Sequence, residues 1–430
     1  MTALATRLAE RRIHYAWVIA GVTFAVAGLM AGVRAAPSVL IVPFEQEFGW
    51  SRTTISLAIG INLLIYGGVG PFAAATMDRF GVRRTMSFAL LATGLGVALT
   101  PAMTHTWQLL ALWGVVGGLG TGFLGWFISA YIATRWFKER QGTVMGVLTA
   151  ANAAGQLVFL PSMAWLTAEA GWRIMSLSLT AIVIGFVPVL LWLMRDHPAD
   201  IGLAPYGAHR VVPRVAATGN PLAAAFRALA EGARLRDFWL LAGTYFVCGA
   251  STNGLITTHL IPACVDHGLT EVVGAGLLAT TGVFSFIGGT ASGWLSDRFD
   301  NRYLLAWYFA LRGLSLIYLP FAFDSAFYGL SLFSVFYGLD WIATGPPTAR
   351  LMSGIVGVER TGIMIAWVTV IHQFGAAGAA YFGGMLRLSF GSYFETFILS
   401  GTLCMVAALM ALLIGARVRD EPVAPALPAE

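Results

Sequence analysis

The stretch FAVAGLMAGVRAAPSVLIV, residues 24–42, is apolar or small at every position except Arg34. About 20 residues of this kind are enough for one helix to cross the hydrocarbon core of a bilayer. A charged side chain at the centre of such a helix costs roughly 2.5–3.5 kcal/mol on insertion scales, so it normally faces protein or water and serves a function. The stretch therefore predicts a membrane helix that contains a functional arginine.

The composition of the whole chain favours a membrane protein. Of its 430 residues, 57% are hydrophobic and 11% are charged, whereas about 25% of the residues in a soluble domain are charged. The predicted fold class is all-α integral membrane, with twelve transmembrane helices at 14–42, 53–77, 85–103, 106–134, 142–167, 172–194, 237–265, 271–296, 303–323, 325–351, 361–387 and 393–416. The three cysteines fall inside or at the ends of these spans and predict neither a disulfide framework nor a metal site.

Positively charged residues are distributed unevenly between the two ends of the expected spans. Most of the 26 lysines and arginines precede the first span, follow the even-numbered spans or lie in the tail. The opposite ends carry only Arg52, Arg173 and Arg387. By the positive-inside rule, we expect a multi-pass protein of the plasma (inner) membrane with both termini cytoplasmic. The formal net charge of +5 is then a topology signal and does not predict nucleic-acid binding.

The chain also repeats itself. The loop MDRFGVRR at 77–84 follows the second expected span, and a similar loop, SDRFDNR at 296–302, follows the eighth. This repeat indicates two pseudo-symmetric six-helix halves in parallel orientation, as in many secondary transporters. The expected divisions are an N-terminal half at 1–194, a cytoplasmic linker at 195–236, a C-terminal half at 237–416 and a cytoplasmic tail at 417–430.

The first of these loops resembles the signature between helices 2 and 3 of the major facilitator superfamily. That resemblance covers the whole chain, because the spans, the loop charges and the half-repeat all fit. It implies that charged loop residues pin neighbouring helix ends on the cytoplasmic face and separate during transport; a solvated positive-inside loop is the alternative. The residues implied are Asp78, Arg79 and Arg83 in the first half and Asp297 and Arg298 in the second.

A closer resemblance is to the monocarboxylate and oxalate porter branch. It is carried by HYAWVIAGVTF at 14–24, RWFKERQGTVMGV at 135–147 and the glycine-rich GVVGGLGTGFLGW at 114–126. Porters of this branch have a basic residue in the outer part of helix 1, a position that Arg34 matches. The resemblance implies a small organic anion as substrate and a proton as a possible co-substrate, that is, symport.

This chain departs from the branch in helix 8. The animal porters carry an aspartate there and, four residues on, an arginine, which bind proton and carboxylate. Ser285 and Gly289 occupy those positions here. Arg34 is therefore expected to be the main anion anchor.

Other polar residues recur at matching depths in the two halves. Arg34 corresponds to Asn253, and Asn152 corresponds to His372, by the offset that relates the two loops. Because substrate sites of such folds lie near the midplane between the repeats, we expect these residues at the central cavity. For each of them except Arg34, an interhelical hydrogen bond is the alternative. Further residues at suitable depth are Gln156, Ser285, Tyr66, Asn62, Gln373 and His259.

A second basic residue at membrane depth, Arg312, has a possible partner. Asp340 lies about as far from the cytoplasmic end of its helix as Arg312 does from the start of its own, roughly 15 Å at 1.5 Å per residue. We expect a structural ion pair. The alternative is that Asp340 carries protons during transport.

The predicted function is transport of a small organic anion, with a carboxylate preferred, by alternating access and in a monomer. The alternatives are an efflux antiporter for drug-like or sugar-derived compounds and a membrane sensor that does not transport. The glycine-proline signature of antiporters is absent from helix 5, which disfavours the first alternative. We find no nucleophile with a base, no phosphate loop and no metal-ligand cluster, so we expect neither an enzyme nor a cofactor.

Overall fold

The structure is a computed structural model that describes residues 14–415 except 126, 209 and 212–220, so the predicted tail at 417–430 lies outside it. The first half comprises α2 (Ala16–Phe48), α3 (Arg52–Phe80), α4 (Val82–Ala98), α5 (Thr106–Leu109), the π-helical η2 (Leu110–Val116), α6 (Gly117–Phe123), α7 (Phe127–Trp136), α8 (Gln141–Ala170) and α9 (Trp172–Leu193). After α10 (Pro221–Gly232), the second half comprises α11 (Arg236–Gly249), the π-helical η4 (Ala250–Ile256), α12 (Thr257–Asp266), α13 (Glu271–Ser296), α14 (Asn301–Ala322), α15 (Ala326–Trp341), α16 (Gly345–Val356), α17 (Val358–Phe390) and α18 (Phe394–Leu412).

The predicted all-α fold of twelve membrane helices in two halves is confirmed. Helices dominate because a bilayer leaves backbone polar groups no partner outside the spanning segment. In the described part of the chain, nine helices are long and apolar enough to cross a membrane. The spans predicted at 106–134, 237–265 and 325–351 are also helical, but each is broken into shorter pieces. Two of the three contain a π-helical segment, a distortion that is frequent at functional sites.

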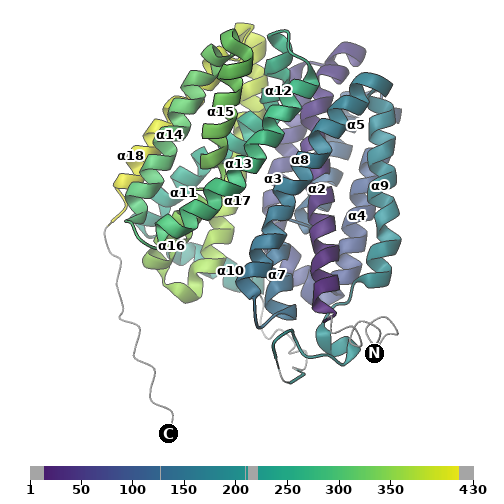
Figure 1. The fold of residues 1–430 in the computed structure, drawn as a ribbon, viewed down its shortest axis with the longest axis vertical. Helices are drawn as coiled ribbons and strands as arrows, with labels where there is room; N and C mark the ends of the chain where they lie inside the picture. Colours follow the sequence, from purple (N-terminus) through teal and green to yellow (C-terminus); the bar gives the residue numbers. More distant parts are fainter. Residues whose placement is uncertain (1–13, 126, 209, 212–220, 416–430) are drawn as a thin grey trace.

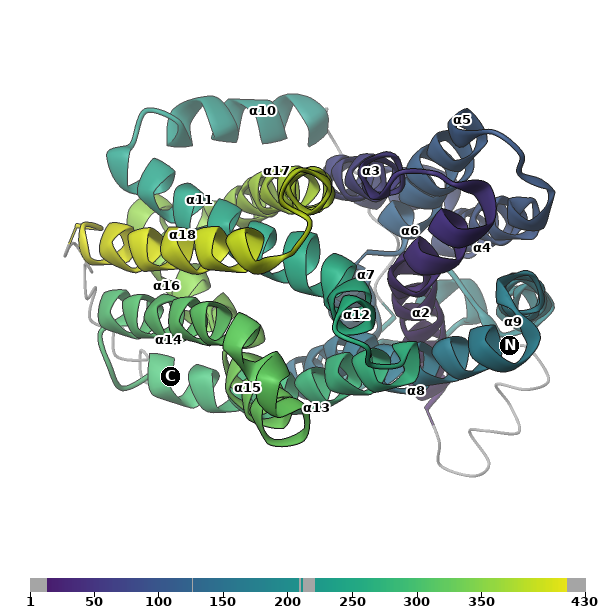
Figure 2. The same cartoon turned by 90° about the horizontal axis from the view of Figure 1, so that it is seen from above.

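The two halves of the chain form two helix bundles that lie side by side (Figures 1 and 2). They meet where α3 packs against α17, α8 against α13 and α2 against α12. The helix α10 lies on the outside of this arrangement and contacts both α17 and α3. The interface between the halves is therefore built from a few long helices of each half.

Gly114, Gly118 and Gly122 of the glycine-rich stretch pack closely on α3. A Cβ atom placed on Gly118 would lie 2.9 Å from the carbonyl oxygen of Asn62, and one placed on Gly122 would lie 3.0 Å from the Cβ of Val69. The first contact is closer than real side chains show, and the second is tighter than almost all real Cβ contacts. Small residues are needed here so that two membrane helices can approach.

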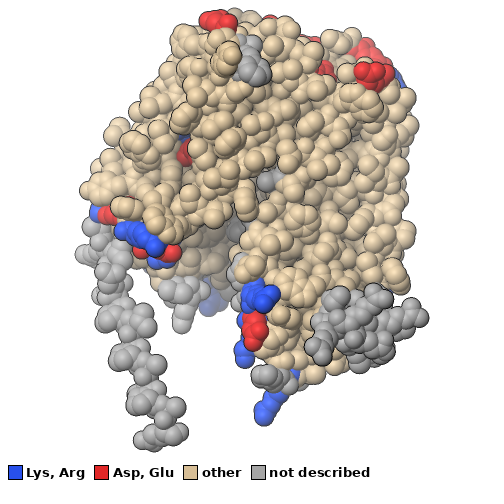
Figure 3. Space-filling view, in the orientation of Figure 1, with Lys and Arg blue, Asp and Glu red and all other residues tan. Residues whose placement is uncertain are grey.

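The two ends of the molecule differ. We call the end where α2 begins and α18 ends the termini end, and the opposite end, where α2 ends and α3 begins, the far end. Figure 3 shows the surface hollowed between the two halves toward the termini end. At the far end, Arg52 of α3 is hydrogen-bonded to Asp266 of α12, which joins the two halves. The structure is thus closed at the far end and open toward the termini end.

Charged side chains gather at the two ends and leave an almost uncharged belt between them (Figure 3). Large apolar side chains face outward from several helices of the belt, among them Trp192 of α9 and Trp307 of α14, which are 66% and 63% exposed. An apolar surface of this extent requires lipid rather than water around it. The protein is therefore a multi-pass membrane protein.

Candidate functional site

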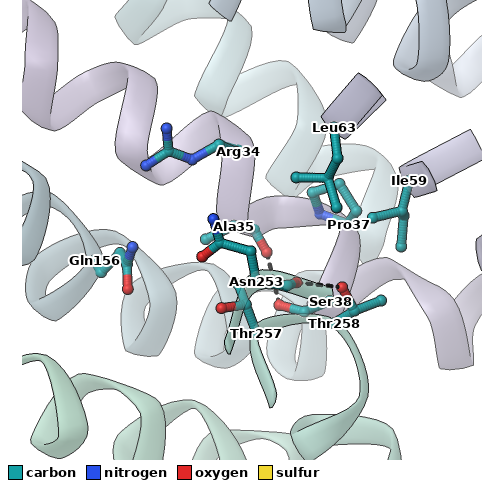
Figure 4. A pocket seen from close by; sticks show the side chains of 10 residues that line it. All are labelled: Arg34, Ala35, Pro37, Ser38, Ile59, Leu63, Gln156, Asn253, Thr257 and Thr258. Carbon is teal, nitrogen blue, oxygen red and sulfur yellow. Dashed lines mark hydrogen bonds between the residues drawn. The ribbon is translucent and has the colours of Figure 1, made fainter. Parts of the chain in front are cut away.

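Arg34 lies on α2, three residues before Pro37, at a small pocket between the two halves. The pocket holds about 20 Å³ of space, room for one or two water molecules. Figure 4 shows Arg34 of α2 and Gln156 of α8 facing the same space as Asn253 of η4. Thr257 lines it beside Asn253. Each half thus contributes polar side chains to one pocket.

The guanidinium group of Arg34 has one direct hydrogen-bond partner among the described residues. Its Nη2 donates to Oδ1 of Asn152 on α8, at 2.5 Å. Its Cζ atom also lies 5.0 Å from the centre of the Tyr66 ring of α3, a cation–π distance. Within the described part of the chain, no carboxylate forms a salt bridge with Arg34. The positive charge is therefore held by neutral groups and remains available to an anion.

The pocket wall in the second half is formed by the distorted segment η4 and the start of α12. Asn253 lies in the π-helical η4, and its carbonyl oxygen accepts a hydrogen bond from Oγ1 of Thr258 at 3.0 Å. Because a π-helical turn contains an extra residue, it shifts the side chains that follow relative to the helix before it. In this way Asn253, Thr257 and Thr258 all line the pocket.

Two of the predicted site residues lie elsewhere. Ser285 of α13 is buried and donates from Oγ to the carbonyl oxygen of Gly282 in its own helix, at 2.7 Å. The ring of His372 on α17 packs against Tyr245 of α11, with 5.1 Å between the ring centres. Neither side chain lines the pocket that contains Arg34. Their depth in the membrane was predicted, but the direction in which they face was not.

The three further polar candidates are buried among helices. The Nδ2 atom of Asn62 donates to the carbonyl oxygen of Trp113 at 2.6 Å. The two ring nitrogens of His259 lie 3.1 Å from the hydroxyl of Tyr393 and 2.9 Å from the carbonyl oxygen of Ala380. Gln373 lies against Gly67 of α3, where a Cβ atom would meet its side chain at 2.6 Å. These contacts fit interhelical roles.

Arg312 and Asp340 lie together in the interior of the second half. The Nε atom of Arg312 on α14 is 2.6 Å from Oδ2 of Asp340 on α15, and both side chains are buried. Nη2 donates to the carbonyl oxygens of Asp340 and Trp341 at 2.9 and 3.1 Å, and Nη1 donates to the sulfur of Cys248 at 2.9 Å. The guanidinium group therefore ties α14 to both α15 and α11.

The loop residues of the family signature make contacts inside their own halves. The guanidinium of Arg79 lies over the ring of Phe80, and the backbone N–H of Arg83 donates to Oδ1 of Asp196 at 2.8 Å. In the second half, Asp297 pairs with Arg350 of α16. Nη1 of Arg298 donates to the carbonyl oxygen of Trp294, while the side chain of Asp78 lies outside the described part. These contacts fit a termini end at which the two halves stand apart.

Sequence reasoning missed a group of charged residues at the far end: Arg52 and Glu45 from the first half, and Asp266 and Arg387 from the second. Arg52 donates to both carboxylate oxygens of Asp266 and to Oε2 of Glu45, each at 2.8 Å. Arg387 donates from Nε to Oδ2 of Asp266 at 2.7 Å. The sequence did single out two of these residues, because Arg52 and Arg387 are exceptions to the uneven distribution of basic residues.

The comparisons with known proteins agree with this architecture. Residues 22–348 match the family model described as Major Facilitator Superfamily. The MFS-type transporter YcxA of Bacillus subtilis is 27% identical over 86% of this chain and 88% of its own. Monocarboxylate transporter 13 of Rattus norvegicus is 24% identical over 92% of this chain and 87% of its own. A solved bacterial homologue of the human lysosomal transporter Spinster superposes with a TM-score of 0.72 at 15% identity, covering 93% of this chain and 97% of that one.

Proposed function

The chain belongs to the Major Facilitator Superfamily, and from that premise we propose that it carries a small organic anion, with a carboxylate preferred, by alternating access. One observation carries the choice of an anion. The Arg34 guanidinium lies at membrane depth beside a pocket, with neutral side chains around it and no carboxylate partner among the described residues. A planar guanidinium can bind a carboxylate with two parallel hydrogen bonds, which supplies both charge neutralisation and orientation.

The position of the pocket favours alternating access. Arg34 and Gln156 belong to the first half, and Asn253 and Thr257 belong to the second. A substrate bound among them would contact both halves, so rocking of one half against the other could expose it to either side in turn. The relatives named as monocarboxylate transporters support an acid as the substrate. We further propose a proton as the co-substrate, which makes the transport a symport.

The orientation follows from the arginine distribution, with the termini end cytoplasmic and the far end outside the cell. In this scheme the structure is open to the cytoplasm. Asp78, Arg79, Arg83, Asp297 and Arg298 would then lie at the cytoplasmic rim, where we propose that they contact the opposite half when that rim closes. Arg312 and Asp340 serve as a structural ion pair within the second half.

The test is a screen of the purified protein for thermal stabilisation by organic acids, followed by counterflow of the stabilising acid in proteoliposomes. A substrate stabilises the folded state by mass action, by about 2.7 kcal/mol at 100 times its dissociation constant. The expected result is stabilisation by one class of carboxylates and not by the matching amides, together with counterflow of the same acid. Stabilisation without counterflow would favour a membrane sensor, and stabilisation by neutral drug-like or sugar-derived compounds alone would favour the efflux antiporter.

A further inference from the structure

The far end of the molecule is closed by one arginine that contacts both halves. Arg52 forms a bidentate salt bridge with Asp266, with both hydrogen bonds at 2.8 Å. Arg52 lies at the start of α3 in the first half, and Asp266 lies at the end of α12 in the second half. Its side chain is 10% exposed and that of Asp266 is 15% exposed. Nη1 of Arg52 also lies 3.5 Å from the hydroxyl of Tyr393. Bidentate arginine–carboxylate pairs that are shielded from water are among the stronger polar contacts in proteins.

The halves also pack tightly beside this salt bridge. A Cβ atom on Gly384 of α17 would lie 2.6 Å from Oγ of Ser56 and 3.0 Å from the carbonyl oxygen of Arg52, both on α3. Ser56 is completely buried by this contact. The far end can therefore open only if α3 and α17 separate here.

Each half holds a second charge that balances the one it brings to the salt bridge. Nε of Arg52 donates to Glu45 at the end of α2, so this pair lies wholly within the first half. Nε of Arg387 on α17 donates to Asp266, so that pair lies wholly within the second half. If the halves separated, Arg52 would keep Glu45 and Asp266 would keep Arg387. The main cost of breaking a shielded ion pair is the charge that is left without a partner. Here no charge would be left without one.

We propose that Arg52, Asp266, Glu45 and Arg387 form a latch: Arg52 binds both Asp266 and Glu45 in the closed state, and in the open state it loses Asp266 and keeps Glu45. This inference goes beyond the proposed function and rests on it only for the assumption that the two halves rock. Asp266 favours the closed state because it is the partner that opening removes from Arg52. Glu45 binds Arg52 in both states, but it stabilises the open state more, because there it is the only carboxylate of the four residues that Arg52 keeps.

The latch is joined to the pocket by α12. Asp266 ends this helix, and Thr257 and Thr258, which line the pocket beside Asn253, begin it. Between them, His259 contacts Tyr393, and the hydroxyl of Tyr393 lies within hydrogen-bonding distance of Arg52. A movement of α12 caused by a ligand at the pocket would therefore change the geometry at Asp266.

The experiment measures how often the far end opens. Ser56→Cys places a thiol at the buried contact between α3 and α17, and a water-soluble maleimide can reach it only when these helices separate. The purified protein is labelled in detergent without added substrate, so the result depends neither on the orientation in the membrane nor on an anion being transported. The parent chain, whose Cys248, Cys264 and Cys404 are buried, gives the background.

We expect the two variants to change the labelling rate in opposite directions. Asp266→Asn should raise the labelling rate of Ser56→Cys roughly threefold or more, and Glu45→Gln should lower it. The matched control is Arg173→Gln, because Arg173 binds Glu47 at the same end but entirely within the first half. It should leave the rate unchanged. Arg52→Lys keeps the charge but loses the bidentate geometry, so it should also raise the labelling rate. This variant replaces Asp266→Asn in the test if Asp266→Asn does not fold.

The latch is overturned if Asp266→Asn and Glu45→Gln shift the labelling rate in the same direction, or if neither shifts it. It is also overturned if Arg173→Gln has an effect as large as theirs. Failure of the proposed function has a different signature, because it would appear as no stabilisation by any organic acid while the labelling rates still moved in opposite directions.

Discussion

Arg34 and Arg312 are the same residue type at membrane depth, yet their surroundings are opposite. Arg312 is 0% exposed and directs its donors to the Asp340 carboxylate, two backbone carbonyls and a sulfur atom. Arg34 is partly exposed and donates one hydrogen bond, to a neutral amide. A guanidinium has five N–H donors. From this difference we infer that an arginine in a membrane helix binds a ligand when its donors remain unused, and holds helices together when the protein itself occupies them.

The largest expected effect is on Arg312. Arg312→Gln should lower the yield of folded protein and its melting temperature, because it leaves the Asp340 carboxylate buried without its cation. Removing one partner of a buried pair typically costs about 3–5 kcal/mol. The yield is measured by size-exclusion chromatography of the detergent extract, and the melting temperature by thermal unfolding.

The double variant Arg312→Gln/Asp340→Asn is the control for this prediction. It removes both charges and should recover part of the loss, since a neutral pair avoids the isolated buried charge. If Asp340→Asn alone leaves folding intact and abolishes only proton-driven uptake, then Asp340 is a proton carrier and the structural interpretation of the pair is wrong.

The next effect is on Arg34 and concerns binding. Arg34→Lys should fold normally but bind the organic acid more weakly by about 1–3 kcal/mol, because an ammonium group cannot reproduce the two parallel hydrogen bonds. Arg34→Gln should abolish binding of the acid without creating comparable binding of its amide. Affinity is measured by titration calorimetry or by concentration-dependent thermal stabilisation. Unchanged affinity in Arg34→Gln would make Arg34 a packing or gating residue and remove the case for an anion.

The sequence predicted the helices and the charged positions better than it predicted which side chains meet. Runs of apolar residues define the spans because a bilayer sets both their length and their polarity. Arg34 stood out because a charge at that depth is costly, and Asp340 because it matched the depth of Arg312. Depth alone does not give the direction in which a side chain faces, so Ser285 and His372 were expected at a pocket that they do not line.

The broken helices and the far-end charges were not predictable in the same way. A π-helical segment such as η4 leaves no reliable mark on an apolar run, because it depends on how neighbouring helices pack. Arg52 and Asp266 are 214 residues apart in the chain and belong to different halves. Their pairing depends on how the two halves pack together, and a pattern of hydrophobic residues does not contain that information.

A smaller effect is expected at Asn152, the amide that Arg34 contacts. Asn152→Ala removes one hydrogen bond to Arg34 and leaves its charge in place, so affinity for the acid should change by roughly 0.5–1.5 kcal/mol. Cys248→Ala is the matched change beside Arg312, and it should alter stability but not affinity. If Asn152→Ala unfolds the protein as Arg312→Gln is expected to do, then Arg34 is held as a structural residue and the contrast between the two arginines disappears.

The smallest effect concerns Asp266, whose pair with Arg52 at the far end is shielded but not fully buried. Burial of Asp266 opposes its ionisation, but hydrogen bonds from Arg52 and Arg387 outweigh this and hold the pKa of Asp266 below its ordinary value. A carboxyl group with a depressed pKa in the folded state stabilises that state above its unfolded pKa of about 3.9, and the contribution is lost as the pH falls through the folded-state pKa. Arg52 and Arg387 donate hydrogen bonds to Asp266, while Glu45 and Tyr393 contact Arg52. The difference in melting temperature between the parent and Asp266→Asn should therefore be constant from pH 5 to pH 8 and shrink only below about pH 4. A difference that changes between pH 5 and pH 8 would mean that a group other than Asp266 sets the strength of the latch.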